Sequence, residues 1–117
     1  MAGTLLFFNL DCECLLVGRA EVGRASGECE KGIVLCTTGI GVSIAANKVK
    51  GIRCALLSDV MSARMTREHN DTNMMAIGAG VVGQMLALEI VDTWLGTEFS
   101  HNERHQRRID KVMALEK

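Results

Sequence analysis

The segment from Cys36 to Lys48 places a thiol, several hydroxyls and two glycines where a short apolar run gives way to an alanine-rich stretch. This pattern predicts a strand that turns directly into a helix. Glycines let the backbone turn sharply and approach a ligand closely, and the N–H groups at a helix start point toward negative charge. The segment therefore predicts an anion site that also holds reactive groups. Because it contains neither a complete dinucleotide fingerprint nor a Walker loop, a plain strand-to-helix connection explains the glycines equally well.

The sequence His-Asn-Asp-Thr-Asn, which begins at His69, forms a second polar cluster at the predicted end of a helix. A histidine titrates near neutral pH and can transfer a proton in catalysis. A helix end, at which His69 favours the helix dipole and Asn70 turns the chain, explains the same residues without catalysis. For this cluster alone, the helix end is the simpler interpretation.

Arg104 and Arg108 form a third candidate, one turn apart on one face of a predicted C-terminal helix. Two guanidinium groups at this spacing can grip a phosphate through several hydrogen bonds. A solvated basic face is the alternative, with Ile109, Val112 and Met113 expected on the opposite side toward the core.

Short apolar runs alternate with helical patterns along the chain, and this alternation must position the three clusters. The predicted strands are residues 4–9, 32–36, 53–58 and 73–77. The predicted helices are residues 19–27, 42–49, 61–70, 83–95 and about 102–115. The pattern indicates an α/β fold, a Rossmann-like three-layer parallel sheet with helices on both faces. Ligands of such sheets collect at the carboxyl ends of the strands, near the loops 37–42, 59–60 and 78–82.

The composition favours a single domain over residues 1–117. A net charge of −1 gives no general attraction to nucleic acid or anionic membranes. Five cysteines at irregular spacing indicate a reducing compartment rather than a disulfide framework, and no zinc-ligand pattern follows Cys12 and Cys14. Neither a signal peptide nor a membrane span fits the N-terminal apolar run, so we expect a cytoplasmic protein.

Together the clusters resemble the ribose-5-phosphate isomerase B family, which includes the galactose-6-phosphate isomerase subunits. The segments that carry the resemblance are the glycine turn at 36–48, Gly-Ile-Arg at 51–53, His-Asn-Asp-Thr-Asn at 69–73, Val-Asp-x-Trp-Leu-Gly at 91–96, and Arg-His-x-x-Arg at 104–108. The resemblance covers residues 20–117, whereas residues 1–19 are atypical. It implies the isomerisation of ribose 5-phosphate to ribulose 5-phosphate, a step of the pentose phosphate pathway, through an enediolate and with no metal or organic cofactor.

The resemblance also assigns roles to residues. It makes Cys36 the base, Thr38 the hydroxyl that moves a proton between the sugar oxygens, and His69 the residue that opens the furanose ring. The substrate-binding residues that it implies are Thr37, Gly39, Ile40, Gly41, Ser43, Asn70, Arg104 and Arg108. The two arginines are expected to reach into a neighbouring subunit's site, which implies a homodimer or a larger homo-oligomer.

Several departures from the family pattern affect the prediction of activity. Thr37 stands where glycine is usual, and Gly80 stands where many members have a phosphate-binding arginine. The N-terminal segment lacks the usual Asp-His, so the first strands are expected to be missing or replaced, with residues 4–9 able to cover the exposed sheet edge. Three hypotheses follow: a working isomerase with a shortened N-terminus, an impaired paralogue that binds a sugar phosphate or serves as a non-catalytic subunit, and a fragment of a longer isomerase.

Overall fold

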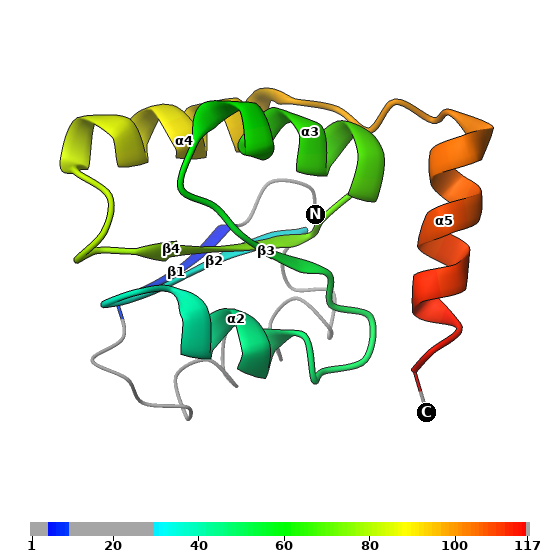
Figure 1. The fold of residues 1–117 in the computed structure, drawn as a ribbon, viewed down its shortest axis with the longest axis horizontal. Helices are drawn as coiled ribbons and strands as arrows, with labels where there is room; N and C mark the ends of the chain where they lie inside the picture. Colours follow the sequence, from blue (N-terminus) through cyan, green and yellow to red (C-terminus); the bar gives the residue numbers. More distant parts are fainter. Residues whose placement is uncertain (1–4, 10–29, 117) are drawn as a thin grey trace.

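A four-stranded parallel sheet lies at the centre of the computed structural model, which describes residues 5–9 and 30–116. Its strands are β1 (Leu5–Asn9), β2 (Lys31–Cys36), β3 (Cys54–Leu56) and β4 (Met74–Gly78), in the order β1-β2-β4-β3 (Figure 1). The predicted α/β fold with a parallel sheet is therefore confirmed. The predicted helix at 19–27 lies outside the described residues.

The N-terminal segment supplies the strand at one edge of the sheet. β1 pairs in parallel with β2, so that Leu5 lies opposite Lys31 and Asn9 opposite Leu35. An uncovered edge strand presents a row of unpaired N–H and C=O groups. The predicted strand at 4–9 is thus confirmed, and it covers the edge of β2.

Helices cover both faces of the sheet (Figure 1). α2 (Ile40–Ala46) lies on one face, and α3 (Val60–Asn70) and α4 (Gln84–Gly96) lie on the other. α5 (Glu103–Met113) stands beside the edge at which the strands begin. None of the helices in the described part of the chain is long and apolar enough to cross a membrane.

Side chains at the helix ends determine where several helices begin or stop. Asp59 caps α3 by accepting a hydrogen bond from the Ser62 amide at 2.6 Å, and Asn102 caps α5 by accepting one from the Arg104 amide at 2.9 Å. Each cap satisfies an amide that has no partner within its helix. At the other end of α2, the Asn47 side chain bonds both to that helix and to the start of β3, which ties the two elements together.

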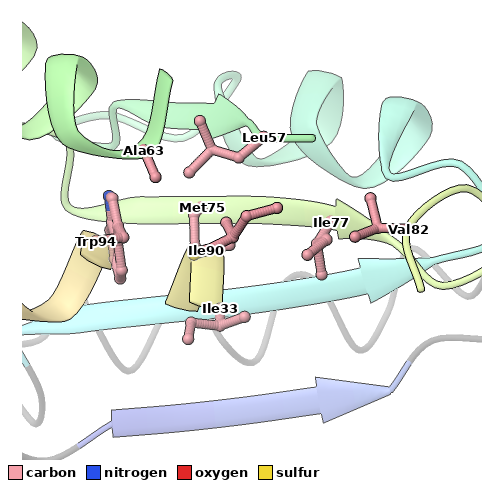
Figure 2. Packing of buried hydrophobic residues seen from close by; sticks show 8 residues of the cluster. All are labelled: Ile33, Leu57, Ala63, Met75, Ile77, Val82, Ile90 and Trp94. Carbon is pink, nitrogen blue, oxygen red and sulfur yellow. The ribbon is translucent and has the colours of Figure 1, made fainter. Parts of the chain in front are cut away.

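The alternation of side chains along β2 and β4 divides the core between the two faces of the sheet. Val34, Met74 and Ala76 pack toward α2, whereas Met75 and Ile77 pack toward α3 and α4. Figure 2 shows the second cluster, which comprises Ile33, Leu57, Ala63, Met75, Ile77, Val82, Ile90 and Trp94. Because both faces of β4 are covered, all five of its residues are buried.

Candidate active site

The turn after β2 depends on two glycines that let strand ends approach each other. Gly39 has φ +78°, and a Cβ there would lie 2.9 Å from the carbonyl carbon of Ile77. A Cβ on Gly78 would lie 2.6 Å from the carbonyl carbon and oxygen of Thr38. These neighbours are backbone atoms, which cannot move aside as a side chain can. The turn is therefore held tightly against the end of β4.

Cys36 ends β2 with its thiol inside this turn, and only 6% of the residue is exposed. The Gly39 amide donates a hydrogen bond to its sulfur at 3.1 Å. Burial is the largest single influence on the Cys36 pKa and raises it, but the amides of Val42, Gly39 and Thr38 and the Thr38 hydroxyl together hold the pKa below its usual value. The surroundings thus favour the thiolate, which is the form that can act as a base.

Thr38 and Ile40, both predicted site residues, are joined by a hydrogen bond within this turn. The Thr38 hydroxyl oxygen accepts a hydrogen bond from the Ile40 amide at 3.2 Å. Two amides of the turn, those of Gly39 and Ile40, are therefore directed at the Cys36 sulfur and the Thr38 oxygen. Backbone amides of the turn thus hold the Cys36 thiol and the Thr38 hydroxyl in place.

Thr37 and Gly80, the two departures from the family pattern, face each other across the turn. The Gly80 amide donates to the Thr37 carbonyl at 2.8 Å, and a Cβ on Gly80 would lie 3.0 Å from both that oxygen and the Thr37 methyl carbon. Thr37 is not among the non-glycine residues with positive φ. A β-branched residue therefore fits the backbone here, and the small residue at position 80 leaves room for it.

The remaining predicted ligand contacts in α2 differ in accessibility. Gly41 is exposed, and beyond its own helix no atom of the described residues lies within 4 Å of a Cβ placed there. Ile40 is also exposed. Ser43 is buried, and its hydroxyl donates to the Ile40 carbonyl at 2.7 Å, so this hydroxyl is engaged within the helix. A substrate contact of Ser43 stays a prediction.

His69 and Asn70 lie at the opposite edge of the sheet from Cys36. α3 begins at the carboxyl edge and runs back, so that these residues end it shortly before β4 starts at Met74. Cys36 pairs with Gly78 at the far end of β4, four residue steps from Met74. At ~3.3 Å per residue, the strand alone separates the two edges by ~13 Å. One chain does not bring Cys36 and His69 together.

The amino edge carries its own basic groove, between α5 and the start of β3. The cavity has a volume of about 840 Å³, and Asn70 and Arg108 line it together with Lys48, Lys50 and Arg53. Arg104 is exposed on the same helix as Arg108. The structure thus places Asn70 and Arg108 on one groove, and their shared role in substrate binding stays a prediction.

The C-terminal helix corrects one expectation about the core. Ile109 is buried and Met113 is half-buried, as predicted. Val112 is 55% exposed and lines the groove instead of facing the core. The buried face of α5 is therefore the one that holds Ile109 and His105, one turn apart.

Sequence reasoning gave no role to two residues that organise this edge. The Arg53 guanidinium donates to the backbone carbonyls of Asn70 at 3.0 Å and Asp71 at 2.7 Å, which fixes the end of α3. The ring of His105 lies 4.2 Å from that of His69, centroid to centroid. The sequence signal for His105 was its place four residues before Ile109. Within the described residues, no three His, Cys, Asp or Glu side chains gather in a way that could hold a metal ion.

Comparison with known proteins gives matches over most of the chain. The model of the family described as Ribose/Galactose Isomerase matches residues 18–112. The chain is 50% identical to ribose-5-phosphate isomerase B of Escherichia coli over 92 residues, which cover 79% of this chain and 61% of that one. It is 40% identical to the galactose-6-phosphate isomerase subunit LacB of Clostridium acetobutylicum over 101 residues, which cover 86% of this chain and 58% of that one. A solved ribose-5-phosphate isomerase B of Clostridium thermocellum superposes with a TM-score of 0.84 at 50% identity, over 87% of this chain and 68% of that one. The chain thus spans about 60% of the length of these curated relatives.

Proposed function

Because this chain belongs to the ribose/galactose isomerase family, we propose that it takes part in the aldose–ketose isomerisation of a sugar phosphate, ribose 5-phosphate to ribulose 5-phosphate. The observation that carries the proposal is the Cys36 thiol, which several hydrogen-bond donors surround at the carboxyl end of β2. These donors lower the pKa of the thiol and so favour its thiolate form, and a base of this kind is what the reaction needs.

The proposed reaction moves one proton between two carbons. The Cys36 thiolate removes the proton from C2 of the open-chain aldose, and negative charge develops on the enediolate oxygens. The same thiol then returns the proton to C1, while the Thr38 hydroxyl carries a proton from O2 to O1. The exposed Gly41, which has no side chain, lies at the start of α2 and lets the sugar approach backbone amides that stabilise the developing charge.

The second half of the proposed site comes from another copy of the chain. His69, Asn70, Arg104 and Arg108 are proposed to open the sugar ring and hold the phosphate, yet they lie at the edge opposite to Cys36. A homodimer in which the carboxyl edge of one copy meets the amino edge of the other would complete two sites by symmetry. The separation of the two edges within one chain supports this arrangement.

A coupled assay for ribulose 5-phosphate tests the reaction. We expect the chain to turn over ribose 5-phosphate and Cys36→Ala to fall to the background rate. Equal background rates for the two folded proteins would refute the isomerase proposal for this chain. If ribose 5-phosphate still binds and Arg104→Ala abolishes that binding, the result would support a binding subunit instead.

Mixing two inactive variants tests the shared site. In a mixed dimer of Cys36→Ala and His69→Ala, one of the two sites keeps both native halves. Random exchange of subunits should therefore restore about a quarter of the wild-type rate, since half of the dimers are mixed and each has one working site. The matched control mixes Cys36→Ala with Cys36→Ser, which share the same defective half and should remain inactive. A Cys36→Ala and His69→Ala mixture that exchanges subunits but stays inactive would rule out the shared site.

A further inference from the structure

The His105 side chain occupies the contact between α3 and α5, where only 6% of the residue is exposed. Its ring lies against that of His69, with the centroids 4.2 Å apart and the planes inclined by 39°. Offset and tilted arrangements of this kind are favourable for aromatic rings. His69 itself is exposed on the last turn of α3, so the His105 ring limits the positions that its imidazole can take.

A short chain of hydrogen bonds holds the His105 ring in place. The Asn102 amide donates to the Ser100 hydroxyl oxygen at 3.3 Å, and that oxygen lies 2.9 Å from His105 Nδ1. The Ser100 hydroxyl can therefore accept from the Asn102 amide and donate its own hydrogen to Nδ1 when that nitrogen is unprotonated. In that tautomer the other ring nitrogen carries the proton and can donate to the backbone carbonyl of Glu68.

The charges around His105 favour the same neutral form. Burial is the main cause that lowers the His105 pKa, and the nearby positive charges of Arg104 and Arg108 and the proximity of His69 lower it further. The backbone carbonyl of Glu68 acts in the opposite direction but does not outweigh them. A neutral ring can therefore remain packed against His69 without adding a further positive charge.

We propose that His105 is a positioning residue. It holds the His69 imidazole of α3 at a fixed place relative to Arg104 and Arg108, which lie on α5 together with His105. The inference rests on the proposed function, in which His69 acts on the sugar ring and the arginines bind the phosphate. A sugar phosphate has a fixed length, so the histidine and the arginines must keep a fixed separation. His105 sets this separation because it contacts His69 on α3 and belongs to the same helix as the arginines.

A double-mutant cycle tests whether His105 acts through His69. His105→Ala should lower kcat for ribose 5-phosphate by about ten- to a hundredfold, and His105→Phe, which keeps an aromatic ring at the contact, should recover most of this loss. In a His69→Ala background, His105→Ala should have no further effect on kcat. Gln106→Ala, at the exposed position next to His105, is the matched control and should leave kcat unchanged. An additional fall in the His69→Ala background would overturn the proposal, because it would show an effect independent of His69.

NMR of histidine-labelled protein gives a readout that needs no turnover. The ring protons of His69 should shift toward the positions of a mobile, solvent-exposed imidazole in His105→Ala, and stay near the wild-type positions in Gln106→Ala. Unchanged His69 resonances in folded His105→Ala protein would overturn the positioning role. If wild-type protein lacks isomerase activity, the proposed function fails, whereas these resonances still decide whether His105 holds His69.

Discussion

Replacing Gly39 with alanine should destabilise the protein more than any other glycine-to-alanine change in the turns around α2. Gly39 combines two constraints: a φ of +78°, and backbone atoms of Ile77 and Gly78 that would lie 2.9 and 3.0 Å from an added Cβ. An L-residue in the left-handed region costs about 1–2 kcal/mol, and forcing a methyl group into a filled space costs about 1–3 kcal/mol more. The expected loss for Gly39→Ala is therefore about 2–5 kcal/mol.

Two other glycines separate these contributions. Gly51 has φ +84°, but apart from its chain neighbours no atom of the described residues lies within 4 Å of an added Cβ, so Gly51→Ala should lose only about 1–2 kcal/mol from backbone strain. Gly41 lies inside α2 without a positive φ, and among the described residues only its own helix approaches an added Cβ, so Gly41→Ala should gain about 0.5–1 kcal/mol. The difference between the Gly39 and Gly51 variants then measures the close approach alone.

Urea unfolding followed by circular dichroism gives the three free energies. The alkylation rate of Cys36 should change in the Gly39 variant but not in the Gly51 variant, because the Gly39 amide donates to the sulfur. If Gly39→Ala loses no more stability than Gly51→Ala, the close packing of the turn against β4 has no energetic weight, and the reasoning from close approach is refuted.

Three further results are expected. Alkylation of Cys36 by iodoacetamide, followed by peptide mass spectrometry, should have its pH midpoint below the ordinary value of about 8.5, and Thr38→Val should raise it because the Thr38 hydroxyl helps to lower the pKa of the Cys36 thiol; a midpoint at or above the ordinary value would contradict the donor arrangement. Trp94→Phe removes the donor of the 3.0 Å bond from the indole nitrogen to the Thr72 hydroxyl and should lower the unfolding free energy in urea by about 1–3 kcal/mol; an unchanged value would show that this buried bond is dispensable. The folded-state pKa of His105 is lowered, so the folded protein binds fewer protons at this residue than the unfolded chain does. The contribution of His105 to the free energy of unfolding should therefore be fully present above about pH 6.5 and be lost as the pH falls through the folded-state pKa. His105→Phe should make the thermal midpoint less dependent on pH in this range, and an identical pH profile would argue against a buried neutral ring.

The sequence predicted most of the elements because each has a local signal. The apolar run at 73–77 predicted a strand, and β4 occupies 74–78. The predicted helix starts at 61 and about 102 lie within one residue of the starts of α3 and α5, which Asp59 and Asn102 cap. The position of His69 could also have been inferred, since a helix that follows a strand in a βαβ unit returns to the amino edge. Spacing along the chain did not reveal this, because residues near the same sheet can belong to either of its edges.

Other features depend on contacts that no local pattern encodes. The packing of α5 against α3 places His105 inside the contact and leaves Val112 exposed. Similarly, the fit of Thr37 beside Gly80 depends on two loops that are far apart in the sequence. A comparison of each position with a family pattern treated these two residues as separate departures, whereas the structure joins them in one contact.

The packing of Gly39 against Gly78 has a consequence for how the protein folds. The donors around the Cys36 sulfur keep their places only after β4 has paired with β2 and its end has packed on the turn. A chain that is still incomplete or unfolded therefore carries an ordinary cysteine, with neither the burial nor the donors that change its acidity. The Cys36 thiol acquires its lowered pKa only when β2 and β4 have paired. The rate at which Cys36 is labelled during refolding therefore reports when this part of the sheet is complete.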